Sequence, residues 1–237
     1  MTHSSLPWCP GAGLRRVYKG KIRDGKFGQQ TAETYEVWEC ATARLGYLHP
    51  FPQIDYSDES YRVSVNASAA IEQYFKLHDV HPTVEAALTQ GLGGSADIAL
   101  SFHVIEHVMD PVVYLSAMRR LVRPGGMAVI LTPNWDDILM KVDPDRMEPF
   151  FYRRVHNYYF TAASLAWVGE LAGWKPVDNI FYHEFGLANT LLWLRDGKPA
   201  GHTRCSGVDQ TMDASWCEYL QQTRQANNVG IVLRNLP

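Results

Sequence analysis

The chain contains little cysteine, no long apolar run and no cluster of positive charge. Four cysteines in 237 residues are too few and too scattered for a disulfide framework. The net charge of −3 disfavours nucleic acid as the main partner, because that binding needs a clustered basic face. No apolar stretch is long enough to span a bilayer, and residues 1–7 lack the apolar core of a signal peptide. We therefore expect a cytoplasmic protein that binds neither nucleic acid nor membrane.

The chain does have enough apolar residues for a full core, since 46% of its residues are hydrophobic. Residues 97–102 form a short apolar run without polar alternation, which is typical of a strand buried in a parallel sheet. Asp110 and Pro111 then supply an N-cap and a first-turn proline for a helix. A second apolar strand follows at residues 127–131. Together these elements predict a right-handed parallel crossover.

The same stretch resembles a known family. Residues 97–111 read Asp-Ile-Ala-Leu-Ser-Phe-His-Val-Ile-Glu-His-Val-Met-Asp-Pro, and Leu-Val-Arg-Pro-Gly-Gly and Thr-Pro-Asn follow by residue 134. In order and spacing this resembles the fourth strand, the next helix and the fifth strand of class I methyltransferases that use S-adenosylmethionine (SAM). The resemblance implies an α/β fold and SAM as the cofactor. Later strands at residues 174–181 and 229–233 resemble the last two strands of that family.

The chain departs from this family before residue 97. A class I methyltransferase carries an earlier strand followed by a glycine-rich loop, and a second strand that ends in a ribose-binding acid. Residues 91–94 contain three glycines but precede a strand, so we predict a turn there and not a cofactor loop. The predicted fold is a partial Rossmann-like methyltransferase sheet, with the carboxyl half recognisable and the first strands missing.

That loss leaves an exposed apolar edge on the strand at residues 97–102, and such an edge needs a cover. Three covers are compatible with the sequence: the N-terminal segment, a predicted helix at residues 65–77, or another chain. The other chain is either a second copy in a homodimer or a complete methyltransferase.

We predict two parts, a β-rich ribbon-like appendage at residues 1–55 and the truncated methyltransferase-like domain at residues 56–237. The appendage resembles a degenerate zinc ribbon, because Cys9 and Cys40 stand where related enzymes carry Cys-x-x-Cys pairs but Ala12 and Ala43 replace the partners. Structural zinc needs four ligands, so we predict no bound zinc.

Site residues follow from the resemblance. It implies that four residues line the cofactor, namely Phe102, His103, Val104 and Ile105. Glu106 and His107 would face the acceptor as the catalytic pair, with histidine as the base because its ordinary pKa is near neutral. The alternative is that this pair only caps the following helix. Three further residues, Tyr61, His156 and Tyr159, are predicted to contact the substrate.

His103-x-x-Glu106-His107 also fits a zinc peptidase pattern, which needs both histidines on one helix. Here the motif lies on a strand end and a loop, so we predict no metal. Among methyltransferases, sugar C-methyltransferases with an N-terminal zinc ribbon resemble this chain most. Two functions remain: methyl transfer to a small molecule such as a nucleotide-linked keto-sugar, or a pseudo-methyltransferase without SAM binding that acts as a subunit or scaffold.

Overall fold

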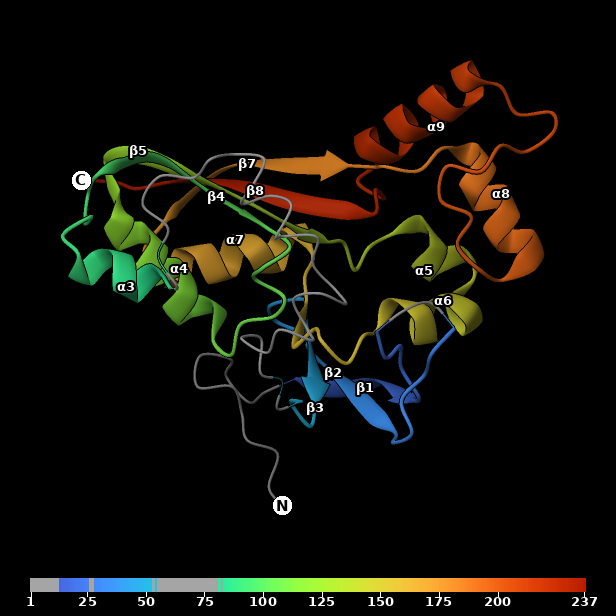
Figure 1. The fold of residues 1–237 in the computed structure, drawn as a ribbon, viewed down its shortest axis with the longest axis horizontal. Coiled ribbons are helices and arrows are strands. Elements are labelled where there is room, and N and C mark those ends of the chain that lie inside the picture. The colour runs from blue at the N-terminus through green and yellow to red at the C-terminus, as the bar shows by residue number, and fades with distance from the viewer. Residues whose placement is uncertain (1–12, 26–27, 53, 55–80, 82) are drawn as a thin grey trace.

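The computed structural model describes residues 13–25, 28–52, 54, 81 and 83–237. These residues form two four-stranded sheets (Figure 1). The main sheet consists of β4 (Ala96–Phe102), β5 (Val122–Pro133), β8 (Asn228–Arg234) and β7 (Lys175–Tyr182), in that order. The N-terminal sheet consists of β1 (Leu14–Gly20), β2 (Tyr35–Cys40), β3 (Leu45–His49) and β6 (Tyr158–Tyr159).

The main sheet has the strand directions that the sequence predicts. β4 and β5 are parallel, and β8 runs antiparallel to both of its neighbours. Three helices lie on one side of it in Figure 1: α3 (Val84–Thr89), α4 (Pro111–Leu121) and α7 (Ala162–Leu171). The other helices are α5 (Ile138–Val142), α6 (Pro144–Phe151), α8 (Leu187–Asp196) and α9 (Gln210–Gln222). The predicted α/β fold, with the carboxyl half of a methyltransferase sheet, is confirmed for the described residues.

Local sequence signals explain where the helices begin. The side chain of Asp110 accepts hydrogen bonds from the backbone N–H groups of Val112 and Val113 at 2.9 and 3.0 Å, and so caps α4. Thr161 and Ser164 form a reciprocal capping box at the start of α7. The glycines between α3 and β4 form turns, as predicted. Both capped helices can therefore pack at fixed positions on the sheet.

β4 is the free edge of the main sheet within the part of the chain that the structure describes. Its side chains alternate: Ser101 is buried, whereas Ile98, Leu100 and Phe102 are 54%, 62% and 51% exposed. Such a row of exposed apolar side chains on an edge strand favours pairing with another element. The expected exposed edge is thus present among the described residues. The predicted helix at residues 65–77 lies outside them.

The N-terminal segment forms more sheet than the sequence predicts. Gly46 and the prolines at residues 50 and 52 are typical of the end of a β-rich segment, but β3 occupies Leu45–His49. β3 also pairs with β6, with Gly46 opposite Tyr159 and Tyr47 opposite Tyr158. The sheet is therefore completed by a strand that lies more than a hundred residues later in the chain.

The two sheets share one hydrophobic core. Leu45 and Tyr47 from the N-terminal sheet pack in the same cluster as Leu115 from α4 and Ile231 from β8. The expected boundary at residues 55 and 56 lies outside the described residues. On either side of it, the described parts contribute side chains to the same buried cluster.

Cys40 is fully buried, and its sulfur is engaged in a disulfide. It is therefore not available as a thiolate ligand for zinc. The absence of zinc remains a prediction from the sequence. None of the described helices has both the length and the apolar composition needed to cross a membrane.

Gly230 lies where β8 passes closest to β5. A Cβ atom there would lie 2.6 Å from the carbonyl oxygen of Ile130, which is closer than real Cβ contacts. We expect Gly230→Ala to lower the free energy of unfolding by about 1–3 kcal/mol, because the central strands must move apart. Urea denaturation measures this change.

Gly93→Ala is the matched control, since its Cβ would meet nothing closer than 3.6 Å. We expect unchanged or slightly increased stability for this variant. Equal stability of both variants would contradict the tight packing of β8 against β5.

Candidate functional site

The candidate site is the loop between β4 and α4, at the carboxyl end of β4. The loop is a turn and not a helix, which agrees with the prediction against the zinc peptidase pattern. His103 has a φ of 55°, in the left-handed region that residues other than glycine seldom adopt. Its backbone N–H nevertheless donates to the carbonyl of Leu131 at 2.8 Å and so stays tied to β5. Such a strained residue next to a ligand-binding edge is typical of functional loops.

Glu106 is the buried centre of this loop, with only 2% of its surface exposed. Its Oε2 accepts a hydrogen bond from the hydroxyl of Thr132 on β5 at 2.9 Å. Its Oε1 lies 3.6 Å from Nδ1 of His103 and 3.7 Å from Nε2 of His107. The structure therefore brings together both residues of the predicted catalytic pair, and adds His103 to them.

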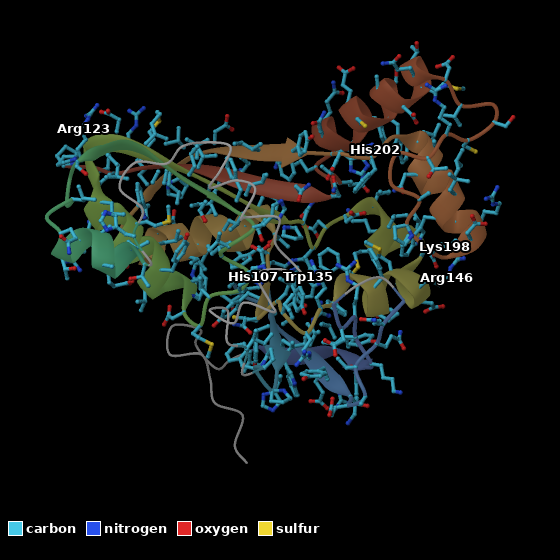
Figure 2. The ribbon with its side chains drawn as sticks, in the orientation of Figure 1. His107, Arg123, Trp135, Arg146, Lys198 and His202 are labelled. Carbon is cyan, nitrogen blue, oxygen red and sulfur yellow. The ribbon has the colours of Figure 1, made fainter. Side chains whose placement is uncertain are left out.

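His107 is held in one tautomer. Its Nδ1 lies 2.7 Å from the carbonyl oxygen of Val155. Because a carbonyl can only accept, Nδ1 carries the proton, and the neutral ring has its lone pair on Nε2, toward Glu106. Burial is the main cause that lowers the pKa of His107, although Glu106 and Val155 act in the opposite direction. Figure 2 places His107 between the main sheet and the N-terminal sheet.

His103 has the opposite shift. Its interaction with Glu106 is the main cause that raises its pKa, and burial opposes the rise. Glu106 thus has a neutral histidine on one side and a more readily protonated one on the other. A carboxylate between two such rings can stabilise a proton that either ring takes up.

His156 completes a cluster with this pair. Its ring packs edge-on against that of His107, with 4.8 Å between the ring centroids. One ligand atom each from Glu106, His107 and His156 lie within 4.8 Å of one another, a spacing that suits a metal ion. However, Nη1 of Arg153 lies 3.5 Å from Nε2 of His156. Arginine only donates, so Nε2 accepts, and the adjacent positive charge opposes a cation. That no metal binds here remains a prediction.

A cavity of about 300 Å³ opens beside this cluster. His103 and His156 line it, together with Pro133 at the end of β5 and Asn228 at the start of β8. Its apolar wall includes Phe150, Phe151, Phe185 and Trp193. The cavity therefore lies at one end of the main sheet, and α6 and α8 enclose its other side.

The remaining predicted site residues have different positions. Phe102 and Val104 are 51% and 40% exposed beside the free edge of β4, whereas Ile105 is fully buried in the shared core. Tyr159 is buried in a second cluster, and its hydroxyl donates to the carbonyl of Arg153 at 3.3 Å. Neither Ile105 nor Tyr159 lines the cavity. Tyr61 lies outside the described residues.

Sequence reasoning missed most residues of this cavity, among them the charged and titratable residues Arg23, Arg153 and His183. Arg23 is in the N-terminal segment, and nothing in its neighbourhood marked it as a site residue. His183 follows β7 without any motif. These residues meet only through tertiary packing, so pattern analysis had no signal by which to find them.

Comparison with known proteins identifies the family of this chain. Residues 35–179 match the family described as "Methyltransferase domain", which covers more than half of the chain. The chain belongs to this methyltransferase family. The family implies SAM as the cofactor. The description names no sugar, so the expected closeness to sugar C-methyltransferases is not supported.

Two curated relatives are similar over part of their length. A probable S-adenosylmethionine-dependent methyltransferase of Mycolicibacterium smegmatis is 31% identical over 128 residues, 53% of this chain and 46% of the relative. A ubiquinone biosynthesis O-methyltransferase of Roseobacter denitrificans is 43% identical over 103 residues, 41% of each protein. These matches span less than half of the length of either relative.

A SAM-dependent methyltransferase from Archaeoglobus fulgidus is a structural neighbour. It is 14% identical, with a TM-score of 0.45, and the match covers 72% of this chain and 73% of that chain.

The central role of Glu106 can be tested by histidine titration. We expect Glu106→Gln to lower the pKa of both His103 and His107, because the carboxylate raises both. Glutamine can still accept a hydrogen bond from Thr132, so the fold should persist. NMR titration of the histidine ring signals measures the change.

Glu218→Gln on α9 is the control, because this exposed side chain accepts a hydrogen bond from Gln222 on the same helix. His183, whose pKa burial lowers to about 4, should titrate identically in both variants. Unchanged pKa values for His103 and His107 in Glu106→Gln would show that the carboxylate does not govern these rings.

Proposed function

We propose that this chain supplies the acceptor side of a SAM-dependent methyltransferase that acts on a small molecule. In this proposal Glu106 and His107 handle the acceptor proton, and the cavity at the end of the main sheet holds the acceptor. A second chain covers the edge of β4 and completes the SAM site. The observation that carries the proposal is the exposed apolar row of β4, which leads directly into the Glu106–His107 loop.

SAM supplies a transferable methyl group when it is bound. Among the described residues, Phe102 and Val104 offer an exposed apolar wall beside β4. In residues 83–237 no strand with a following loop stands on the open side of β4 to receive the ribose or the methionine part. The described residues therefore do not fit SAM by themselves, and we derive no step through it.

The chemistry of the acceptor side rests on residues of this chain. The bond from Nδ1 of His107 to Val155 leaves Nε2 as the basic atom. A proton taken up at Nε2 would be stabilised by the Glu106 carboxylate 3.7 Å away. This role suits removal of a proton from an acceptor hydroxyl, the acceptor type that the names of the O-methyltransferase relatives favour. It also suits removal of a proton from a carbon beside a ketone, as methylation of a keto-sugar would require.

The second candidate is a pseudo-methyltransferase that binds no SAM and serves as a scaffold. The same exposed edge favours it, because a scaffold also needs a docking surface. The two candidates differ in what the complex does: the first predicts methyl transfer that depends on His107, and the second predicts none.

Isothermal titration tests the split cofactor site. We expect the isolated chain to show no binding of S-adenosylhomocysteine up to about 1 mM, because the part of the chain that the structure describes offers few polar contacts to the cofactor. Micromolar affinity of the isolated chain would overturn the split-site proposal and indicate a complete cofactor site.

Light scattering tests the docking edge. We expect the purified chain to self-associate through β4 in the absence of another partner, and Leu100→Lys to render it monomeric, since a charge at this 62% exposed position blocks the apolar contact. Val113→Lys is the matched control, because Val113 is 60% exposed but lies on α4. The same oligomeric state in both variants would exclude the β4 face as the interface.

A further inference from the structure

Two arginines are held side by side on the wall of the cavity. The backbone N–H of Arg23 donates to the carbonyl of Tyr152 at 3.0 Å, and that of Arg154 donates to the carbonyl of Arg23 at 3.0 Å. These bonds form a parallel bridge in which Arg23 stands opposite Arg153. Both side chains line the same cavity. The fold therefore places two like charges on one wall of the cavity, and the charge of Arg153 contributes to the lowered pKa of Arg23.

Arg23 has no counter-ion within the described part of the chain. Its guanidinium lies over the ring of Phe150, 4.2 Å from the centroid. Its Nε is buried and makes no hydrogen bond to any described residue. Burial and then the charge of Arg153 lower its pKa to about 9, so it remains protonated at neutral pH. By contrast Arg154, which follows Arg153 in the sequence, pairs with Asp24 at 2.7 Å.

His183 adds a third donor on the same cavity. Its Nδ1 accepts a hydrogen bond from the backbone N–H of Asn227 at 3.0 Å. The ring is neutral near pH 7, because burial lowers its pKa to about 4, and the backbone of Phe185 acts more weakly in the opposite direction. Its proton is therefore on Nε2, which is buried and meets no acceptor in good hydrogen-bond geometry among the described residues. Buried donors without acceptors are costly unless a ligand satisfies them.

The carboxylates of the cavity do not balance these donors. Asp137 is used as the N-cap of α5, where its side chain accepts from the backbone N–H of Leu139 at 2.7 Å. Glu184 is exposed and lies 3.9 Å from Nε2 of His202. Each of these two acids already has its own partner, and neither of them pairs with Arg23.

We propose that this cavity binds an acceptor through an anionic group, a carboxylate or a phosphate, held by Arg23 and Arg153. The aromatic side chains Phe150, Phe151 and Trp193 would contact its apolar, planar body. The buried N–H of His183 would donate to one of its oxygens. The inference rests on the proposed function, and it names the substrate class of that site as a small organic anion. His103 and His156 line the same cavity, whereas Glu106 and His107 do not; His103 lies 3.6 Å from Glu106, and the ring of His156 packs against that of His107, so the pair is one side chain away from the ligand.

The proposal can be tested by calorimetric titration of the full chain with three probes of similar shape: benzoate, phenyl phosphate and benzamide. We expect at least one anion to bind about tenfold or more tightly than neutral benzamide. The tighter of the two anions identifies the group as carboxylate or phosphate. Equal affinity for benzamide and the anions, or no binding of any probe at about 10 mM, would overturn the proposal.

Arg23→Gln should weaken binding of the preferred anion by about tenfold or more, whereas Arg23→Lys should retain part of the affinity. Arg154→Gln is the matched control, because Arg154 pairs with Asp24 outside the cavity, and it should bind as the unaltered chain does. Unchanged affinity in Arg23→Gln contradicts the proposal. Thermal melting checks folding, and if Arg23→Gln is unfolded, the comparison of benzoate with benzamide on the unaltered chain decides.

These outcomes are independent of the cofactor experiment. Micromolar binding of S-adenosylhomocysteine by the isolated chain would overturn the split cofactor site but would leave the anion result unaffected. If the anions bind no more tightly than benzamide, the proposed substrate class is wrong, but the proposed β4 interface is unaffected.

Discussion

The hydrogen bonds between Glu106 and the segment before β6 hold the site and the two sheets together. The carbonyl of Glu106 accepts from the backbone N–H groups of Asn157 and Tyr158 at 2.7 and 3.2 Å. The side chain of Asn157 donates to the carbonyl of His107 at 2.8 Å, and the backbone carbonyl of Asn157 accepts from the backbone N–H of Leu48 on β3 at 2.9 Å. One short segment thus fixes the loop between β4 and α4, β6 and the N-terminal sheet to one another.

This junction explains why a buried carboxylate is tolerated. An isolated ionised group at 2% exposure would be strongly destabilising. Here the hydroxyl of Thr132 and the rings of His103 and His107 surround the carboxylate of Glu106, and the backbone bonds prevent the loop from turning it to solvent. The strain of His103 in the left-handed region, of order 1 kcal/mol, is offset by the same contacts. Protonation of the histidines and the position of the loop are therefore linked.

The sequence predicts the parts of the fold that depend on local pattern. The crossover of β4, α4 and β5 follows from apolar runs, an Asp-Pro helix start and a glycine stop. The free edge of β4 follows from the absence of the family's first-strand pattern in the sequence before residue 97. The sequence does not predict β3, because Gly46 and the prolines after it resemble the end of a segment, and pairing with β6 overrides that signal. The presence of paired acid–base side chains on the loop was predictable from Glu106 and His107. The inward position of Ile105 was not, because it depends on how the turn packs.

The cavity is the part of the site that the sequence predicts least, because its charged residues come from distant positions. Arg23 lies near the start of the chain and Arg153 far beyond it, and only a backbone bridge makes them neighbours. A pattern search evaluates residues within a short window, so two arginines separated in this way carry no joint signal.

The two sides of the loop between β4 and α4 differ in how far the described residues enclose them. On one side, described residues enclose a cavity of about 300 Å³ with buried donors and aromatic walls. On the other, β4 presents Ile98, Leu100 and Phe102 more than half exposed, beside a strand edge whose backbone has no partner among the described strands. Among the described residues, the cavity side of this loop therefore keeps its buried charged groups in fixed positions, whereas the side toward β4 is open.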